Sequence, residues 1–160
     1  MNTMCKLRKI LGIMVLAVVI INFGFRPQTV DAETLTFTTS KPDGCTFTKG
    51  AWEKTRNIYY IYTDIVVGEL CYGFDTFLTN EDYVWTRSIQ YDHKSYLVNN
   101  SGSYVSATYP ASADATWAKV EKANSKSSNP TYGIKFLNVY DLDKSDFTVG
   151  GEDNSTHKKK

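Results

Sequence analysis

Short stretches rich in Thr, Tyr, Val, Ile and Phe alternate along this chain with clusters of Gly, Asn, Asp, Ser and Pro. The first group favours strands and the second favours turns, so the pattern predicts an all-β fold. We expect a single small antiparallel β-sandwich over residues 33–149. The expected strands cover residues 34–39, 45–49, 57–67, 69–77, 83–98, 103–109, 116–122 and 131–140.

Two turns are predicted most clearly. Residues 41–44 read Lys-Pro-Asp-Gly, in which Pro presets φ and Gly accepts a positive φ. Residues 99–102 read Asn-Asn-Ser-Gly between two strand-like stretches and predict a hairpin. Residues 51–56 are compatible with one helical turn, residues 124–130 with a polar loop, and residues 150–160 with a disordered polar tail.

The first 32 residues have the layout of a secretory signal peptide. Lys6, Arg8 and Lys9 precede an apolar run over residues 10–25, and polar residues follow. The small side chain of Ala32 suits cleavage before Glu33, which predicts a secreted, extracellular protein with no membrane span after processing. An uncleaved membrane anchor is the alternative, because about 17 apolar residues are enough to span a bilayer.

Charge narrows the range of partners. Removing residues 1–32 takes four of the 18 basic and one of the 17 acidic residues, leaving 14 basic against 16 acidic and a net charge of −2. Nucleic-acid binding requires a basic stripe, and membrane-disrupting peptides require a basic amphipathic face. The sequence therefore argues against both classes.

Two cysteines, Cys45 and Cys71, remain after the expected cleavage. In an oxidising compartment we expect them to form one structural disulfide. Closing a loop of about 26 residues contributes roughly 3 to 3.5 kcal/mol in the chain-entropy model. Catalytic or metal-binding thiols are the alternative, but neither a CxxC spacing nor a nearby His favours them.

The sequence offers few catalytic groups. His93 is the one histidine within the expected domain, and we expect it to face solvent in a hairpin. His93 and Ser95 can share one face of a strand, but Asp92 is adjacent to His93 and points to the opposite face, so the three residues do not form a relay. We therefore expect no enzymatic activity, no cofactor and no metal.

Calcium binding by residues 141–152 is left open. Asp141, Asp143, Ser145 and Glu152 follow the oxygen-ligand spacing of a calcium loop. Asp146, however, occupies the position where such loops need Gly, and a solvated acidic stretch is the preferred interpretation.

Part of the chain resembles the lactococcin 972 family of secreted bacteriocins. The resemblance rests on Tyr-Val-Trp at residues 83–85, Tyr-Asp-His-Lys-Ser-Tyr-Leu-Val-Asn-Asn at residues 91–100 and Ala-Thr-Trp-Ala-Lys-Val at residues 115–120, with Tyr132 and Phe136 after them. It covers under half of the chain. Members of that family are usually shorter after processing and lack cysteine, whereas this chain adds residues 33–78 with both cysteines.

The resemblance implies an antiparallel β-sandwich that binds the lipid-linked cell-wall precursor of target bacteria without forming pores, and it leaves a homodimer open. It assigns five side chains to recognition and none to chemistry: Trp85, Tyr91, His93, Trp117 and Lys119. We therefore expect a bacteriocin-like antibacterial protein that binds a cell-envelope component. A secreted protein-interaction or adhesion module is the alternative, and a secreted hydrolase comes third.

Overall fold

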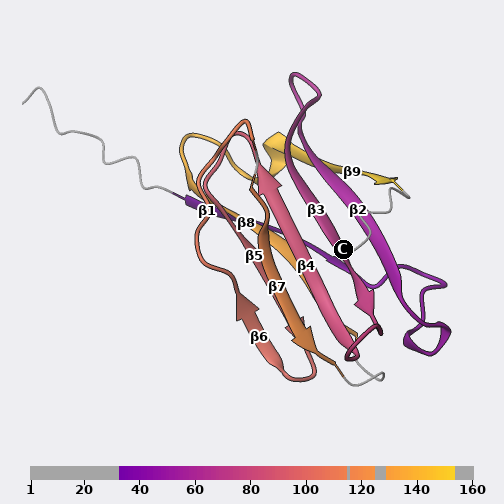
Figure 1. Ribbon diagram of the computed structural model, residues 1–160. Coiled ribbons are helices and arrows are strands. Elements are labelled where there is room, and N and C mark those ends of the chain that lie inside the picture. Colours follow the sequence, from indigo (N-terminus) through magenta and orange to yellow (C-terminus); the bar gives the residue numbers. More distant parts are fainter. Residues whose placement is uncertain (1–32, 115, 125–128, 154–160) are drawn as a thin grey trace, which may run out of the picture. The chain divides into compact units, whose positions relative to one another are not determined.

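The computed structural model describes residues 33–114, 116–124 and 129–153, which form two antiparallel β-sheets packed face to face (Figure 1). The strands of this part of the chain are β1 (Glu33–Ser40), β2 (Trp52–Tyr60), β3 (Ile65–Asp75), β4 (Glu81–Ser88), β5 (His93–Asn99), β6 (Gly102–Val105), β7 (Ala118–Ala123), β8 (Thr131–Val139) and β9 (Phe147–Asp153). Two short 3-10 helices, η1 (Phe47–Lys49) and η2 (Lys144–Asp146), lie in connections. The predicted antiparallel β-sandwich is confirmed.

Sheet A has the strand order β1-β8-β5-β6, and sheet B has the order β7-β4-β3-β2-β9. The β1–β2, β3–β4, β5–β6 and β7–β8 connections lie at one end of the sandwich, here called the lower end (Figure 1). The other four connections lie at the upper end. Most connections pass from one sheet to the other, so the sheets are joined at both ends.

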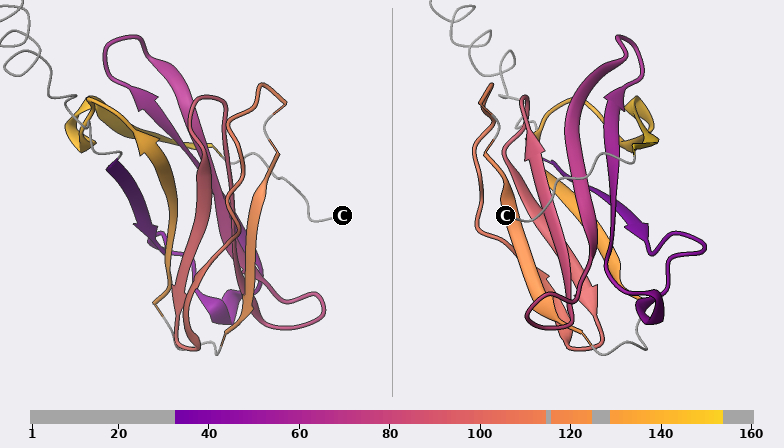
Figure 2. Two further views of the ribbon diagram at one scale, coloured as in Figure 1. Left: turned by 90° about the vertical axis from the view of Figure 1, so that its left-hand side faces the viewer. Right: turned by 45° about the vertical axis from the view of Figure 1, so that its right-hand side comes forward.

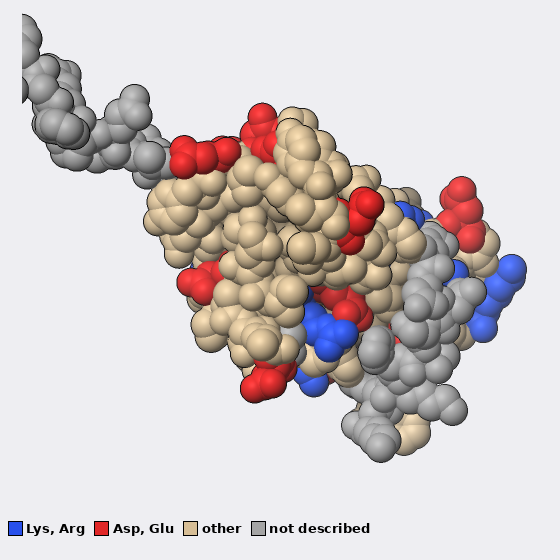
Figure 3. Space-filling model, turned by 90° about the horizontal axis from the view of Figure 1, so that it is seen from above, with Lys and Arg blue, Asp and Glu red and all other residues tan. Residues whose placement is uncertain are grey.

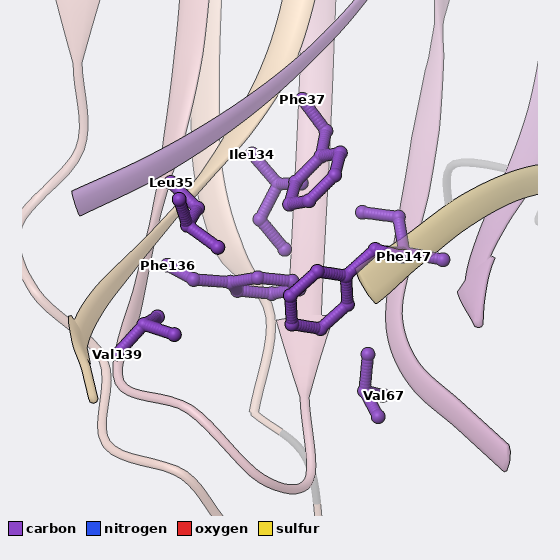
Figure 4. Packing of buried hydrophobic residues seen from close by; sticks show 8 residues of the cluster. Leu35, Phe37, Val67, Ile134, Phe136, Val139 and Phe147 are labelled. Carbon is purple, nitrogen blue, oxygen red and sulfur yellow. The ribbon is translucent and has the colours of Figure 1, made fainter. Parts of the chain in front are cut away.

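Aromatic and aliphatic side chains fill the space between the sheets in two clusters. In the first, the rings of Phe37, Phe136 and Phe147 pack in tilted and edge-to-face arrangements with centroids 5.5–6.2 Å apart (Figure 4). The remaining buried members of this cluster are Leu35, Ile58, Val67, Ile134 and Val139. The second cluster lies nearer the lower end and contains Leu70, Tyr72, Val84, Leu97, Val120 and Tyr132.

Buried polar side chains of β4 and β5 connect the two sheets in what we call the polar seam. Thr86 Oγ1 lies 2.9 Å from Ser95 Oγ, which in turn donates to the Ala118 carbonyl oxygen at 2.7 Å. Nearer the lower end, Asp82 accepts hydrogen bonds from Asn99 Nδ2 at 3.1 Å and from Tyr132 Oη at 3.0 Å. Burial raises the pKa of Asp82 above its usual value, and these hydrogen bonds oppose the shift.

Both predicted turns are confirmed. The Cys45 amide donates to the Pro42 carbonyl oxygen at 3.2 Å, and Gly44 adopts φ +78°. Asn99 pairs with Gly102 at the end of the β5–β6 hairpin, where Gly102 has φ +146°.

Two predicted strands, over residues 57–67 and 83–98, are each divided by a turn without Gly or Pro. In the first, Asp64 adopts φ +53° and its amide donates to the Tyr60 carbonyl oxygen at 3.0 Å, which closes the β2–β3 hairpin. In the second, Ser88 Oγ accepts from the amides of Gln90 and Tyr91 at 3.3 and 3.0 Å. Asp and Ser side chains favour such turns, but they do so less visibly than Gly or Pro.

Other local predictions were wrong. Residues 45–49 contain η1 instead of a strand, and residues 51–56 belong almost entirely to β2 instead of a helical turn. Residues 150–153 complete β9, so the expected polar tail does not begin at residue 150. The edge strand β9 was missed because Gly150 and Gly151 read as turn residues.

The predicted disulfide is wrong for this structure, in which Cys45 and Cys71 are both free thiols. Cys71 is fully buried in the middle of β3, whereas Cys45 is half-buried in the β1–β2 connection. The number of residues between two cysteines sets the loop size, but it does not orient the side chains toward each other as a bond requires. Burial raises the pKa of the Cys71 thiol far above its usual value.

The predicted signal peptide, residues 1–32, lies outside the described residues, as do residues 154–160. Within the described part of the chain, no helix has the length and apolar character needed to cross a membrane.

Truncating a central phenyl ring tests the core. We expect Phe136→Ala to lower the free energy of unfolding by roughly 3 to 5 kcal/mol, because it leaves a cavity between the sheets. Urea titration followed by fluorescence measures this loss. The matched control is Phe77→Ala, since Phe77 is 86% exposed, and a similar loss in both variants would contradict the described packing.

Thiol titration tests the cysteines in a Cys5→Ser background. In the native protein, Cys45 should react with Ellman's reagent much faster than Cys71, because a buried thiol of raised pKa supplies little thiolate. Cys45→Ser should remove the fast phase, and Cys71→Ser should leave it. A protein whose thiols become reactive only after reduction would instead contain the disulfide.

Candidate functional site

The candidate site is on the outer face of sheet B. Along β4, Val84 and Thr86 point between the sheets, so Trp85 and Arg87 point outward. Lys119 of β7 lies directly opposite Trp85, and Trp117 precedes the same strand. We call Trp85, Arg87, Trp117 and Lys119 the aromatic–basic patch.

In this patch, each indole ring carries a cation over its face. Lys119 Nζ lies 4.1 Å from the centroid of the Trp85 ring, and Arg87 Cζ lies 4.7 Å from that of the Trp117 ring. The two indole centroids are 6.5 Å apart. Such cation–π contacts hold flexible basic side chains close to flat apolar surfaces.

Neighbouring carboxylates orient the patch. Glu69 Oε2 accepts from Arg87 Nε at 2.8 Å, and Glu121 Oε1 accepts from Trp85 Nε1 at 2.9 Å. The Arg87 guanidinium is thereby largely neutralised. Lys119, by contrast, is exposed and forms no ion pair with any described carboxylate. Its ammonium group is therefore the most available positive charge of the patch.

The remaining predicted recognition residues, Tyr91 and His93, lie elsewhere. The Tyr91 ring packs 5.1 Å from Phe136 and 6.0 Å from Phe147, beside the first core cluster. His93 is fully buried between the sheets, so the prediction that it faces solvent was wrong. Alternation along β5 places His93 on the same side as Ser95 and Leu97, which is the core side.

The contacts of His93 indicate a structural role. Its Nε2 lies 3.1 Å from the Thr86 carbonyl oxygen, which can only accept, so the neutral ring donates there. Burial lowers the pKa of His93, against the opposing influence of its hydrogen bonds to the Thr86 and Tyr91 backbone. The ring therefore stays neutral and serves to satisfy a backbone carbonyl inside the sandwich.

A metal site gains no support from the described residues. They contain no group of three or more His, Cys, Asp or Glu side chains placed to hold a metal ion. In the acidic stretch left open for calcium, Asp143 instead caps η2, accepting from the Ser145 amide at 2.6 Å. The hydrogen bond from the Ser145 hydroxyl and that from its amide lower the pKa of Asp143.

Sequence reasoning missed Arg87 and its partner Glu69. The signal for Arg87 was available, because a residue two positions after an outward-facing Trp85 shares its face. Glu69 had no such signal, since its position opposite Arg87 depends on the pairing of β3 with β4.

Comparisons of this chain with family models, with curated proteins and with solved structures find no match. The resemblance to the lactococcin 972 family therefore stays a prediction.

The burial of His93 predicts a pH dependence of stability. Since its pKa is lower in the folded than in the unfolded chain, its contribution is complete above about pH 6.5 and is lost as the pH falls below that value. The free energy of unfolding should fall less between about pH 7.5 and about pH 5.5 in His93→Gln than in the wild type. His157→Gln is the control, and parallel curves for all three proteins would contradict the prediction.

Proposed function

We propose that this protein is exported and acts as a non-enzymatic, bacteriocin-like binder of a bacterial cell-envelope component, and that it binds through the aromatic–basic patch. The observation that carries the proposal is the convergence of Trp85, Trp117 and Lys119 on one outer face. These three residues are separated by up to 34 positions in the sequence, yet Lys119 and both indoles form one continuous surface.

The chemistry of the patch suits a glycan that carries an anionic group. Indole faces pack against the apolar faces of sugar rings, and an ammonium group binds phosphate or carboxylate oxygens. The lipid-linked cell-wall precursor combines sugars, a pyrophosphate and a peptide. Lys119, whose ammonium group lies over the Trp85 ring, supplies the cation for its anionic part, and movement of Lys119 toward that anion uncovers the face of the partly buried Trp85 for a sugar ring.

The limited charge of the patch also favours a selective binder over an unspecific polyanion binder. Glu69 neutralises Arg87, and Glu121 lies beside Trp85. Extended phosphate polymers require many unpaired basic groups, and among the described residues of the aromatic–basic patch only Lys119 offers one. One accessible ammonium beside two aromatic rings instead suits a single short ligand.

A secreted protein-interaction or adhesion module is the second candidate. One observation favours it: the β2–β3 hairpin at the upper end exposes several large apolar side chains. Tyr62 is 69% exposed and Ile65 is 52% exposed, and Ile61 and Val66 lie beside them. Apolar tips of this kind are common in protein interfaces.

Binding measurements on patch variants test the first candidate. We expect Trp85→Ala and Lys119→Ala each to weaken binding of purified lipid-linked cell-wall precursor roughly ten-fold, because each removes one principal contact. Isothermal titration calorimetry measures the affinity. Growth inhibition of related bacteria, with and without added precursor, measures the activity that depends on it.

Sheet A provides a matched control. Lys135 Nζ lies 4.6 Å from the Tyr96 ring centroid, which repeats the cation–π geometry on another part of the molecule. Tyr96→Ala and Lys135→Ala should leave the affinity unchanged. Equal losses of affinity in the patch variants and in the sheet A variants would rule out the patch as the binding surface. Loss of activity only in Tyr62→Ser and Ile65→Ser would favour the protein-interaction module.

A further inference from the structure

The β3–β4 connection at the lower end carries the two most exposed large apolar side chains of the described residues. Phe77 is 86% exposed and Leu78 is 87% exposed, and they are adjacent in sequence. Contiguous exposed apolar surface in a folded protein often marks a binding site. We call this pair the apolar tip.

The tip has a defined backbone. Asp75 and Glu81 pair at the base of the connection, as the final residues of the β3–β4 ladder. The Phe77 amide donates to Asp75 Oδ1 at 2.9 Å, which forms a local Asx turn. In the left view of Figure 2, this connection projects sideways from the lower end of the sandwich. The apolar side chains are therefore presented beyond the surrounding surface.

The charge of the two ends differs. Within the described connections of the upper end there are six Asp residues and one Lys: Asp64, Asp92, Asp114, Asp141, Asp143, Asp146 and Lys144. Acidic side chains are spread over this end in Figure 3. The described connections of the lower end contain Lys41, Lys49 and Asp43. Asp75 and Glu81 lie at the base of the apolar tip, so an anionic lipid surface repels both ends, but it repels the upper end with its six Asp residues more strongly.

We propose that the apolar tip inserts Phe77 and Leu78 into the interfacial region of a lipid bilayer and holds the domain at the membrane surface. A bilayer accommodates a projecting pair of apolar side chains without a preformed pocket, whereas a protein partner needs a complementary cavity and a wider interface. The Asp75 carboxylate is engaged by the Phe77 amide and does not need to enter the bilayer.

Insertion would also orient the aromatic–basic patch, a consequence that rests on the proposed function. Trp85 follows Glu81, the first residue of β4, by four positions, or about 13 Å along the strand. If β4 then runs along the membrane normal, the patch stands just above the lipid headgroups. That height suits the sugar and peptide portion of a lipid-linked precursor, whose lipid chain stays in the bilayer.

Fluorescence quenching locates the inserted residues in the full-length chain. It reports on the introduced tryptophan itself, so membrane binding by residues 1–32 does not obscure the result. Phe77→Trp and, as the matched control at the upper end, Ile61→Trp are mixed with phosphatidylcholine vesicles whose acyl chains carry bromine. Bromine quenches tryptophans that enter the bilayer. We expect the added signal to be quenched in Phe77→Trp and to be unaffected in Ile61→Trp, above the background of the three native tryptophans.

Vesicle sedimentation of the secreted form measures the contribution of the tip to binding. Phe77→Ser/Leu78→Ser should bind at least ten-fold more weakly than the wild type, and Val105→Ser, another exposed apolar position, should bind unchanged. Because the contact is apolar, binding should persist on vesicles without anionic lipid and at high salt.

Equal quenching at positions 61 and 77, or binding that survives the double substitution, would overturn the proposal. So would a concentration-dependent dimer that the double substitution abolishes, since the tip would then contact a second copy of the chain. Binding of the precursor in detergent is measured separately. If the wild type binds the precursor but not vesicles, only the membrane role of the apolar tip is refuted. If it binds vesicles but not the precursor, only the proposed function is refuted.

Discussion

The polar seam between β4 and β5 is the constraint on which the arrangement of this protein depends. Buried polar groups are costly unless each finds a partner, so Thr86, Ser95 and His93 are compatible with essentially one placement of sheet A against sheet B. Apolar packing alone tolerates sliding of one sheet over the other. The hydrogen bonds of Asp82 with Asn99 and Tyr132 extend the same restriction to the lower end.

The seam also determines which side chains reach solvent. Because Val84 and Thr86 face inward, Trp85 and Arg87 must face outward, and pairing with β7 places Lys119 beside them. Strand β4, which carries Trp85 and Arg87, begins shortly after the apolar tip. Trp85 and Arg87 of the aromatic–basic patch and the projecting apolar tip thus lie on one short length of chain, whereas Trp117 and Lys119 are added by the pairing of β7 with β4.

The sequence predicted the presence of the strands better than the residues at which they begin and end. Strands rich in β-branched and aromatic residues were found where Gly or Pro marks the turn, as at Gly44 and Gly102. Turns that depend on Asp64 or on the hydroxyl of Ser88 were missed, because these residues close a turn only when the flanking strands are already in register. The same limit applies to β9, whose pairing with β2 stabilises a glycine-containing edge.

The sequence by itself determined the all-β class, most of the strands and the grouping of residue types that the patch uses, since these follow from local preference and from the two-residue period of a strand. Only the tertiary structure decided that Trp85, Trp117 and Lys119 meet on one surface while His93 is enclosed, and that Cys45 and Cys71 do not bond. The physical reason is that alternation defines two faces of each strand, but which face is covered depends on strand order and on the packing of the sheets.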